Sequence, residues 1–227
     1  APQQLRTRGL MDTPICRGDY LRDENWLGSY YELSLDLGPC GDDELASIAL
    51  QALWQSPRLA GPWEGREGFG GPASKMAFGG PGTNTTFHGA LTMPDGSELG
   101  CRAYLIRVAD ESDWLNLSIP TSMLELRYPV TYPLDSTTNP WLRTADSCFV
   151  ELATSIYRRA PFRLGLLGEE CGGFRTAAEL SIRDCEVGGL LVPLRLWNRL
   201  SPSRTAELLP EGLAHVPFLG PHITYGQ

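Results

Sequence analysis

The stretch that decides the fold is Ser29-Tyr30-Tyr31-Glu32-Leu33-Ser34-Leu35-Asp36-Leu37. Its larger apolar side chains recur at every second position: Tyr31, Leu33, Leu35 and Leu37. Polar side chains fall between them: Glu32, Ser34 and Asp36. Because successive side chains of a strand point to opposite faces, this alternation predicts a β-strand with one buried and one solvent-exposed face.

The residues after this strand predict a helix over about 42–56. Apolar side chains follow one another at helical spacing: Leu45, Ile48, Ala49, Ala52 and Leu53. Asp42 or Asp43 is placed to cap the helix, and Pro57 ends it. A strand and a helix that each have one apolar face predict a helix packed on a sheet.

Residues 84–119 predict a three-stranded meander. Three alternating segments are separated by the turn at 94–97, which has the sequence Pro-Asp-Gly-Ser, and by a second turn at 110–113. Turns this short join antiparallel neighbours.

A second helix is predicted to start at Asn139 as N-cap with Pro140 in its first turn, and to end before Pro161. Its apolar stripe is Trp141, Ala145, Cys148, Phe149, Leu152 and Ile156. After it we expect a buried strand at 162–167, a short helix within 174–183, and an edge or bulged strand at 190–197 that contains Pro193.

These elements predict an α+β fold: a mixed, mainly antiparallel sheet with the two main helices packed on one face. We expect residues 16–227 to form a single domain and residues 1–15 to be a mobile tail. Residues 60–83 are rich in glycine and proline and predict a long loop without regular structure, whose aromatic side chains hold it against the surface.

Composition excludes several classes of function. The chain has 227 residues and a net charge of -8, with no basic cluster of the kind that nucleic-acid binding needs. No apolar run is long enough to predict a membrane span. The six cysteines form no C-x-x-C pair, so we expect reduced thiols, no metal site and a cytoplasmic protein. No nucleotide or other cofactor motif is present, and we expect no cofactor.

Two sets of residues are candidates for function. Glu169, Glu170 and Cys171 follow a predicted buried strand and precede two glycines, which would suit a nucleophile or a carboxylate pair at a strand end; a polar turn is the alternative. No histidine adjoins them in the sequence, and His88 is expected on a solvated strand face. Trp63 and Phe69, in the glycine-rich loop, are the aromatic side chains expected to be exposed and to bind a partner.

Three segments carry a resemblance to a known class: Tyr30 to Leu35, the helix ending Ala52-Leu53-Trp54, and Phe162 to Glu170. Over about half of the chain these segments resemble immunity proteins of bacterial toxin systems. The resemblance implies a small cytoplasmic bacterial protein that binds and blocks a partner. It carries no site residue.

We therefore expect a non-enzymatic protein-binding module, of immunity or inhibitory type, whose acidic surface engages a partner that could be basic. One alternative is an enzyme that uses the Glu169–Cys171 cluster. Another is a structural accessory protein, such as one of phage origin.

Overall fold

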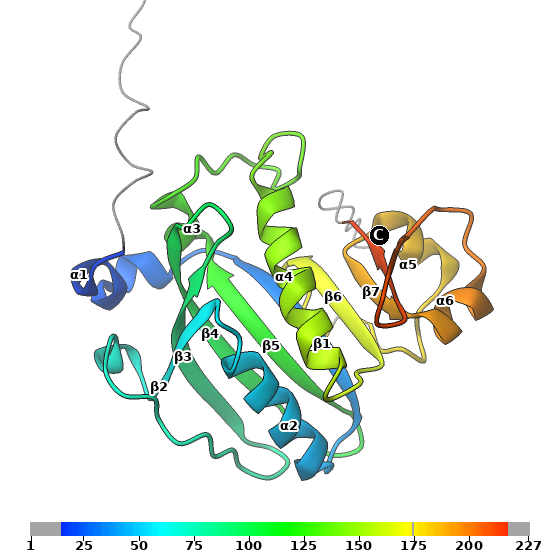
Figure 1. The fold of residues 1–227 in the computed structure, drawn as a ribbon, viewed down its shortest axis with the longest axis horizontal. Helices are drawn as coiled ribbons and strands as arrows, with labels where there is room; N and C mark the ends of the chain where they lie inside the picture. The colour runs from blue at the N-terminus through cyan, green and yellow to red at the C-terminus, as the bar shows by residue number, and fades with distance from the viewer. Residues whose placement is uncertain (1–14, 174, 218–227) are drawn as a thin grey trace, which may run out of the picture.

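The computed structural model describes residues 15–173 and 175–217, which form one nine-stranded sheet (Figure 1). The strand order is β2-β3-β4-β5-β1-β6-β7-β9-β8. The strands are β1 (Tyr30–Pro39), β2 (Leu59–Trp63), β3 (Asn84–Thr92), β4 (Glu98–Ile106), β5 (Ser112–Pro120), β6 (Leu164–Glu169), β7 (Leu190–Pro193), β8 (Glu207–Leu209) and β9 (Leu213–Val216). Each neighbouring pair is antiparallel, so within the described residues the sheet is not mixed.

Two helices cover one face of this sheet, as the sequence predicts: α2 (Asp43–Trp54) and α4 (Leu142–Tyr157) lie across its front in Figure 1. Their apolar stripes and the Tyr31 face of β1 make the main core. The shorter helices are α1 (Arg17–Leu21), α3 (Thr121–Glu125), α5 (Ile182–Val187) and α6 (Leu194–Leu200), with 3-10 turns η1 (Asp23–Trp26) and η2 (Arg66–Gly68). The predicted α+β class is confirmed. None of the helices found within 15–173 and 175–217 is long and apolar enough to cross a membrane.

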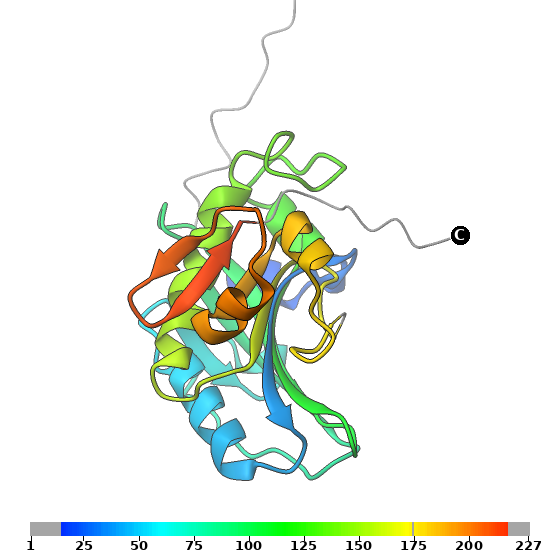
Figure 2. The same ribbon diagram turned by 90° about the vertical axis from the view of Figure 1, so that its right-hand side faces the viewer.

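A second, smaller core forms where α5 and α6 pack with β6, β7 and β9 (Figure 2), and Trp114 of β5 belongs to it. The predicted strand at 190–197 is wrong in its second half, because α6 begins at Leu194, directly after Pro193. Proline suits a position next to a helix start, since it has no N–H to leave unpaired. The short helix expected within 174–183 lies mostly later, with α5 starting at Ile182.

The two best-patterned elements differ from prediction at one point each. β1 has no solvent-exposed polar face: Glu32, Ser34 and Asp36 are 4%, 0% and 1% exposed. The helix predicted to start at Asn139 starts at Leu142. The side chain of Asn139 is instead buried and binds the preceding loop, accepting from Thr131 N at 2.8 Å and donating to Thr131 O at 2.7 Å.

The glycine-rich stretch 60–83 is not wholly irregular, because its first residues belong to β2, which pairs with β3. Farther along, Phe78 packs against the core, and Gly79 O accepts from Arg107 at 3.3 Å. Arg107 is buried and also pairs with Asp113 at 3.0 Å. The loop therefore lies on the sheet, as its aromatic residues predict.

The N-terminal tail expected at 1–15 lies outside the described residues except for its last residue. Ile15 is 5% exposed and belongs to the main core, so the predicted tail is too long by at least one residue.

Candidate functional site

The face of the sheet opposite α2 and α4 carries polar side chains in register across three strands. Asn116 of β5 lies between Tyr104 of β4 and Ser34 of β1. In the adjacent row, Ser118 of β5 lies between Arg102 and Glu32. Directly opposed residues of antiparallel strands share a face, so these six side chains form one polar patch.

Four of these six side chains are buried, and residues 170–173 cross over part of the patch; Arg102 and Tyr104 are half-buried. Glu32 accepts from Tyr104 Oη at 2.8 Å and from the backbone N of Gly172 at 3.2 Å. Burial raises the pKa of the Glu32 carboxyl group, although the Tyr104 and Gly172 hydrogen bonds oppose the rise. Arg102 donates from Nε to Ser118 Oγ at 3.2 Å and stacks over the ring of Tyr30, with its guanidinium carbon 4.0 Å from the ring centre.

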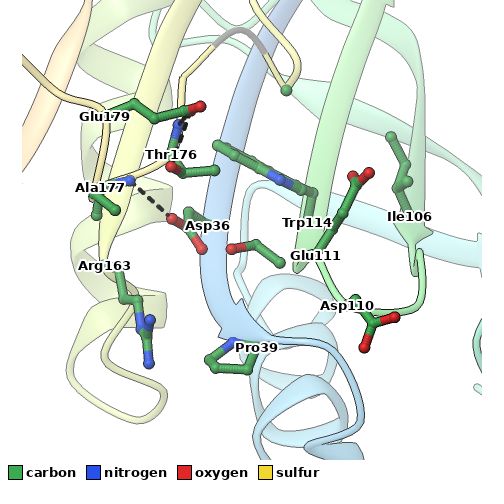
Figure 3. A pocket seen from close by; sticks show the side chains of 13 residues that line it. Asp36, Pro39, Ile106, Asp110, Glu111, Trp114, Arg163, Thr176, Ala177 and Glu179 are labelled. Atoms are coloured by element: carbon green, nitrogen blue, oxygen red, sulfur yellow. Dashed lines mark hydrogen bonds between the residues drawn. The ribbon is translucent and has the colours of Figure 1, made fainter.

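Next to the polar patch, one row along the same strands, the sheet face opens into a pocket of about 640 Å³ (Figure 3). Trp114 of β5 and its register partner Asp36 of β1 form part of its wall. The turn after β4 contributes Asp110 and Glu111, and the segment before α5 contributes Glu179. We call this site the acidic pocket.

The carboxylates of the acidic pocket differ in their hydrogen bonds and in their exposure. Asp36 accepts from Gly38 N at 2.9 Å and from Ala177 N at 3.1 Å, so both of its oxygens are bound. Glu179 accepts from the backbone N of Thr176, and this hydrogen bond lowers the pKa of its carboxyl group. Asp110 and Glu111 are exposed.

One basic residue, Arg163, also lines the acidic pocket, but its guanidinium group lies against Gly38 at the end of β1. Figure 3 shows its side chain extending away from Trp114. The pocket is therefore negative and has an aromatic wall, two properties that favour a cationic group.

The side chains of the predicted cluster Glu169–Cys171 mainly bind neighbouring segments of the chain and stabilise the fold. Glu169 accepts from Ser29 Oγ, and Glu170, in the left-handed region at φ 49°, accepts from the backbone N of Tyr30 at 3.0 Å. Cys171 is half-buried, and its Sγ donates to the backbone oxygen of Glu32 at 3.5 Å. Burial and the nearby charge of Glu32 hold the pKa of the Cys171 thiol well above its usual value, which disfavours the thiolate that nucleophilic attack requires.

The two aromatic residues of the glycine-rich loop are not both exposed. Trp63 is 4% exposed and donates from Nε1 to Gly71 O at 3.1 Å, so the prediction of its exposure is wrong; Phe69 is half-buried beside it, with ring centres 5.2 Å apart. The expectation of a solvated His88 is also wrong. This side chain is half-buried, its ring centre is 5.2 Å from that of Trp26, and burial lowers its pKa to about 4.

Sequence reasoning missed the polar patch and the acidic pocket. The available signal was that the strand at 112–120 repeats the polar alternation of β1, with Asn116 and Ser118 between apolar residues. Two alternating strands that pair in register place their polar residues side by side. The signal could not show that residues 170–173 cover them.

No group of three or more potential ligand side chains is placed to hold a metal ion within 15–173 and 175–217. The chain matches no protein-family model, and the searches of curated proteins and of solved structures give no significant match either.

Proposed function

We propose that this protein is a non-enzymatic binding module that takes an arginine or lysine side chain of a protein partner into the acidic pocket. The observation that carries the proposal is one cavity of about 640 Å³ in which Asp110, Glu111 and Glu179 accompany the ring of Trp114. Carboxylates give a cation charge-assisted hydrogen bonds, and an indole face adds cation–π attraction.

The charge of the whole chain supports the same kind of partner. A net charge of -8 attracts a basic protein from a distance and raises the rate of encounter. An inhibitory action, which the resemblance to immunity proteins implies, would follow if the captured basic side chain is one that the partner needs for its own activity.

A tripeptide that contains arginine can test the acidic pocket before the protein partner is identified. We expect acetyl-Gly-Arg-Gly-amide to shift the indole N–H resonance of Trp114 saturably in a ¹⁵N correlation spectrum. The same peptide with citrulline in place of arginine keeps the shape but loses the charge, and should bind about tenfold more weakly, as expected for hydrogen bonds that lose their charge.

Matched triple variants separate the pocket from general charge. Asp110→Asn with Glu111→Gln and Glu179→Gln should abolish the saturable shift. Glu24→Gln with Glu64→Gln and Glu125→Gln removes as many charges from exposed positions outside the pocket and should retain it. Equal weakening by both triple variants, or equal affinity for the arginine and citrulline peptides, would refute the proposal.

A further inference from the structure

Two side chains of the polar patch are unpaired although they are completely buried. Ser34 and Asn116 are both 0% exposed, and neither Ser34 Oγ nor Asn116 Oδ1 or Nδ2 has a hydrogen-bond partner among the described residues. A buried polar group left unpaired costs on the order of 1–3 kcal/mol. Such groups are uncommon in native proteins, and each one calls for an explanation.

The other four side chains of the polar patch have hydrogen-bond partners, so the lack of pairing is specific to Ser34 and Asn116. Arg102 pairs with Ser118, and Tyr104 donates to Glu32 rather than to its register partner Asn116. Ser34 and Asn116 face each other in register on adjacent strands, and still do not pair. The surrounding groups are thus fixed in place while the hydroxyl and the carboxamide remain free to bind.

The cover over these two side chains is thin. A Cβ atom added to Gly172 would lie 3.3 Å from Asn116 Oδ1, 3.2 Å from Glu32 Oε2 and 3.8 Å from Ser34 Oγ. Gly172 itself is exposed to solvent on its outer side. Gly172, a residue without a side chain, therefore lies directly over the unpaired groups.

Two hydrogen bonds join Glu170 to Tyr30: Glu170 N donates to Tyr30 O at 2.9 Å, and Tyr30 N donates to Glu170 Oε1 at 3.0 Å. Beyond Glu170 the attachment of this cover to the sheet is weak. Among the described residues it consists of the 3.2 Å bond from Gly172 N and the 3.5 Å contact of Cys171 Sγ, both to Glu32. A bond to sulfur at this distance is weak. Displacing Gly172 breaks few interactions.

We propose that Ser34 and Asn116 form a second binding site, for the amide group of a small neutral ligand, which enters when Gly172 moves away from the sheet. The carboxamide of Asn116 presents a donor and an acceptor in one plane, and the complementary group is another amide with the reverse arrangement. The hydroxyl of Ser34 supplies a further donor or acceptor. The carboxyl group of Glu32 lies beside this site, because Gly172 covers both Glu32 and Asn116. A carboxylate there disfavours an anionic ligand. This site shares no binding residue with the acidic pocket, so either proposal can fail alone.

Acetamide is the probe, with acetate as its charged counterpart of similar size. In ¹⁵N correlation spectra of the whole chain, acetamide should shift the side-chain amide resonances of Asn116 and the backbone resonance of Gly172 saturably, and acetate should not. Ser34→Ala should weaken acetamide binding about fivefold, the effect of one neutral hydrogen bond. Asn116→Leu should abolish it. The Arg peptide that tests the acidic pocket should leave the side-chain amide resonances of Asn116 unshifted; the Gly172 resonance does not serve for this control, because Gly173 lines the acidic pocket.

Thermal stability gives a second readout that does not depend on the probe. If Ser34 is kept for binding rather than for folding, Ser34→Ala removes an unpaired buried group and should raise the Tm by about 3 °C. Ser118→Ala is the matched control on the same face: its hydroxyl is equally buried but pairs with Arg102, so the Tm should fall. A fall in Tm for both variants would overturn the proposal, as would acetamide shifts that rise linearly without saturation or that Ser34→Ala leaves unchanged.

Discussion

Asp146 lies in α4 and turns its carboxyl group into the core, where Tyr31 Oη donates to Asp146 Oδ1. The ring of Tyr31 stacks on Phe149, with ring centres 5.8 Å apart. Asp146 is 6% exposed, and burial raises the pKa of its carboxyl group to about 6. Between about pH 4 and pH 6 the folded protein therefore holds a proton that the unfolded chain, with an aspartate pKa near 3.9, releases.

The sign of the pH effect follows from this difference. Because the folded pKa is the higher one, Asp146 stabilises the folded state below pH ~4, and this contribution is lost as the pH rises through about 6. Asp146→Asn imitates the protonated form. Urea unfolding should show the variant gaining stability over the wild type as the pH rises, by up to about 2 kcal/mol at pH 7.5 and by little at pH 4.5. A difference that stays constant from pH 4.5 to pH 7.5 would assign the effect to packing rather than to the proton.

At the scale of the elements, the sequence predicted what depends on local pattern. β1, α2 and the meander of β3, β4 and β5 follow from side-chain alternation or helical spacing and from their turns. β2 and the cover at 170–173 do not follow from local pattern, because both depend on residues far away in the sequence. β2 forms by pairing with β3, and the cover is held by Glu32 and Tyr30 of β1. The candidate site was therefore missed, although each of its residues is in a predicted element or turn.

The helix starts offer a direct test of this difference. Asp42 caps α2, its Oδ1 accepting from Leu45 N at 2.9 Å, so Asp42→Ala should cost about 1 kcal/mol. Asn139 joins several backbone groups of the preceding loop and is fully buried, so Asn139→Ala should cost more, about 3 kcal/mol, by leaving those groups unpaired. Free energies of unfolding in urea measure both. If Asn139→Ala costs no more than Asp42→Ala, the side chain acts as an ordinary helix cap, as first predicted.

At the scale of the whole molecule, two parts of the sheet meet at a short contact between β6 and β7. β3 and β4 pair continuously from Asn84 opposite Ile106 to Thr92 opposite Glu98. β6 and β7 are in register only where Gly165 faces Leu191 and Leu166 faces Leu190. β7 and β9 lie beyond this narrow join, although Leu191 of β7 and Leu213 of β9 pack in the main core.

Native-state hydrogen exchange should detect this join. We expect the backbone amides of β7 and β9 to exchange through a local opening, with a lower free energy than the amides of β1 and β5. The reason is that β7 pairs with β6 at only two register positions, whereas β1 pairs with β5 along nearly its whole length. Equal protection of all four strands would show that the two cores open together.

The strand order has a consequence for synthesis of the protein on the ribosome. β1 comes before the other strands of the described residues, but it lies between β5 and β6, with Leu33 opposite both Leu117 and Leu167. Contacts between residues so far apart in the chain form slowly, and an apolar strand awaiting its neighbours is prone to aggregate. A nascent chain that has not yet reached residue 169 therefore leaves one edge of β1 incompletely paired, and such an edge can pair with the strand of another chain.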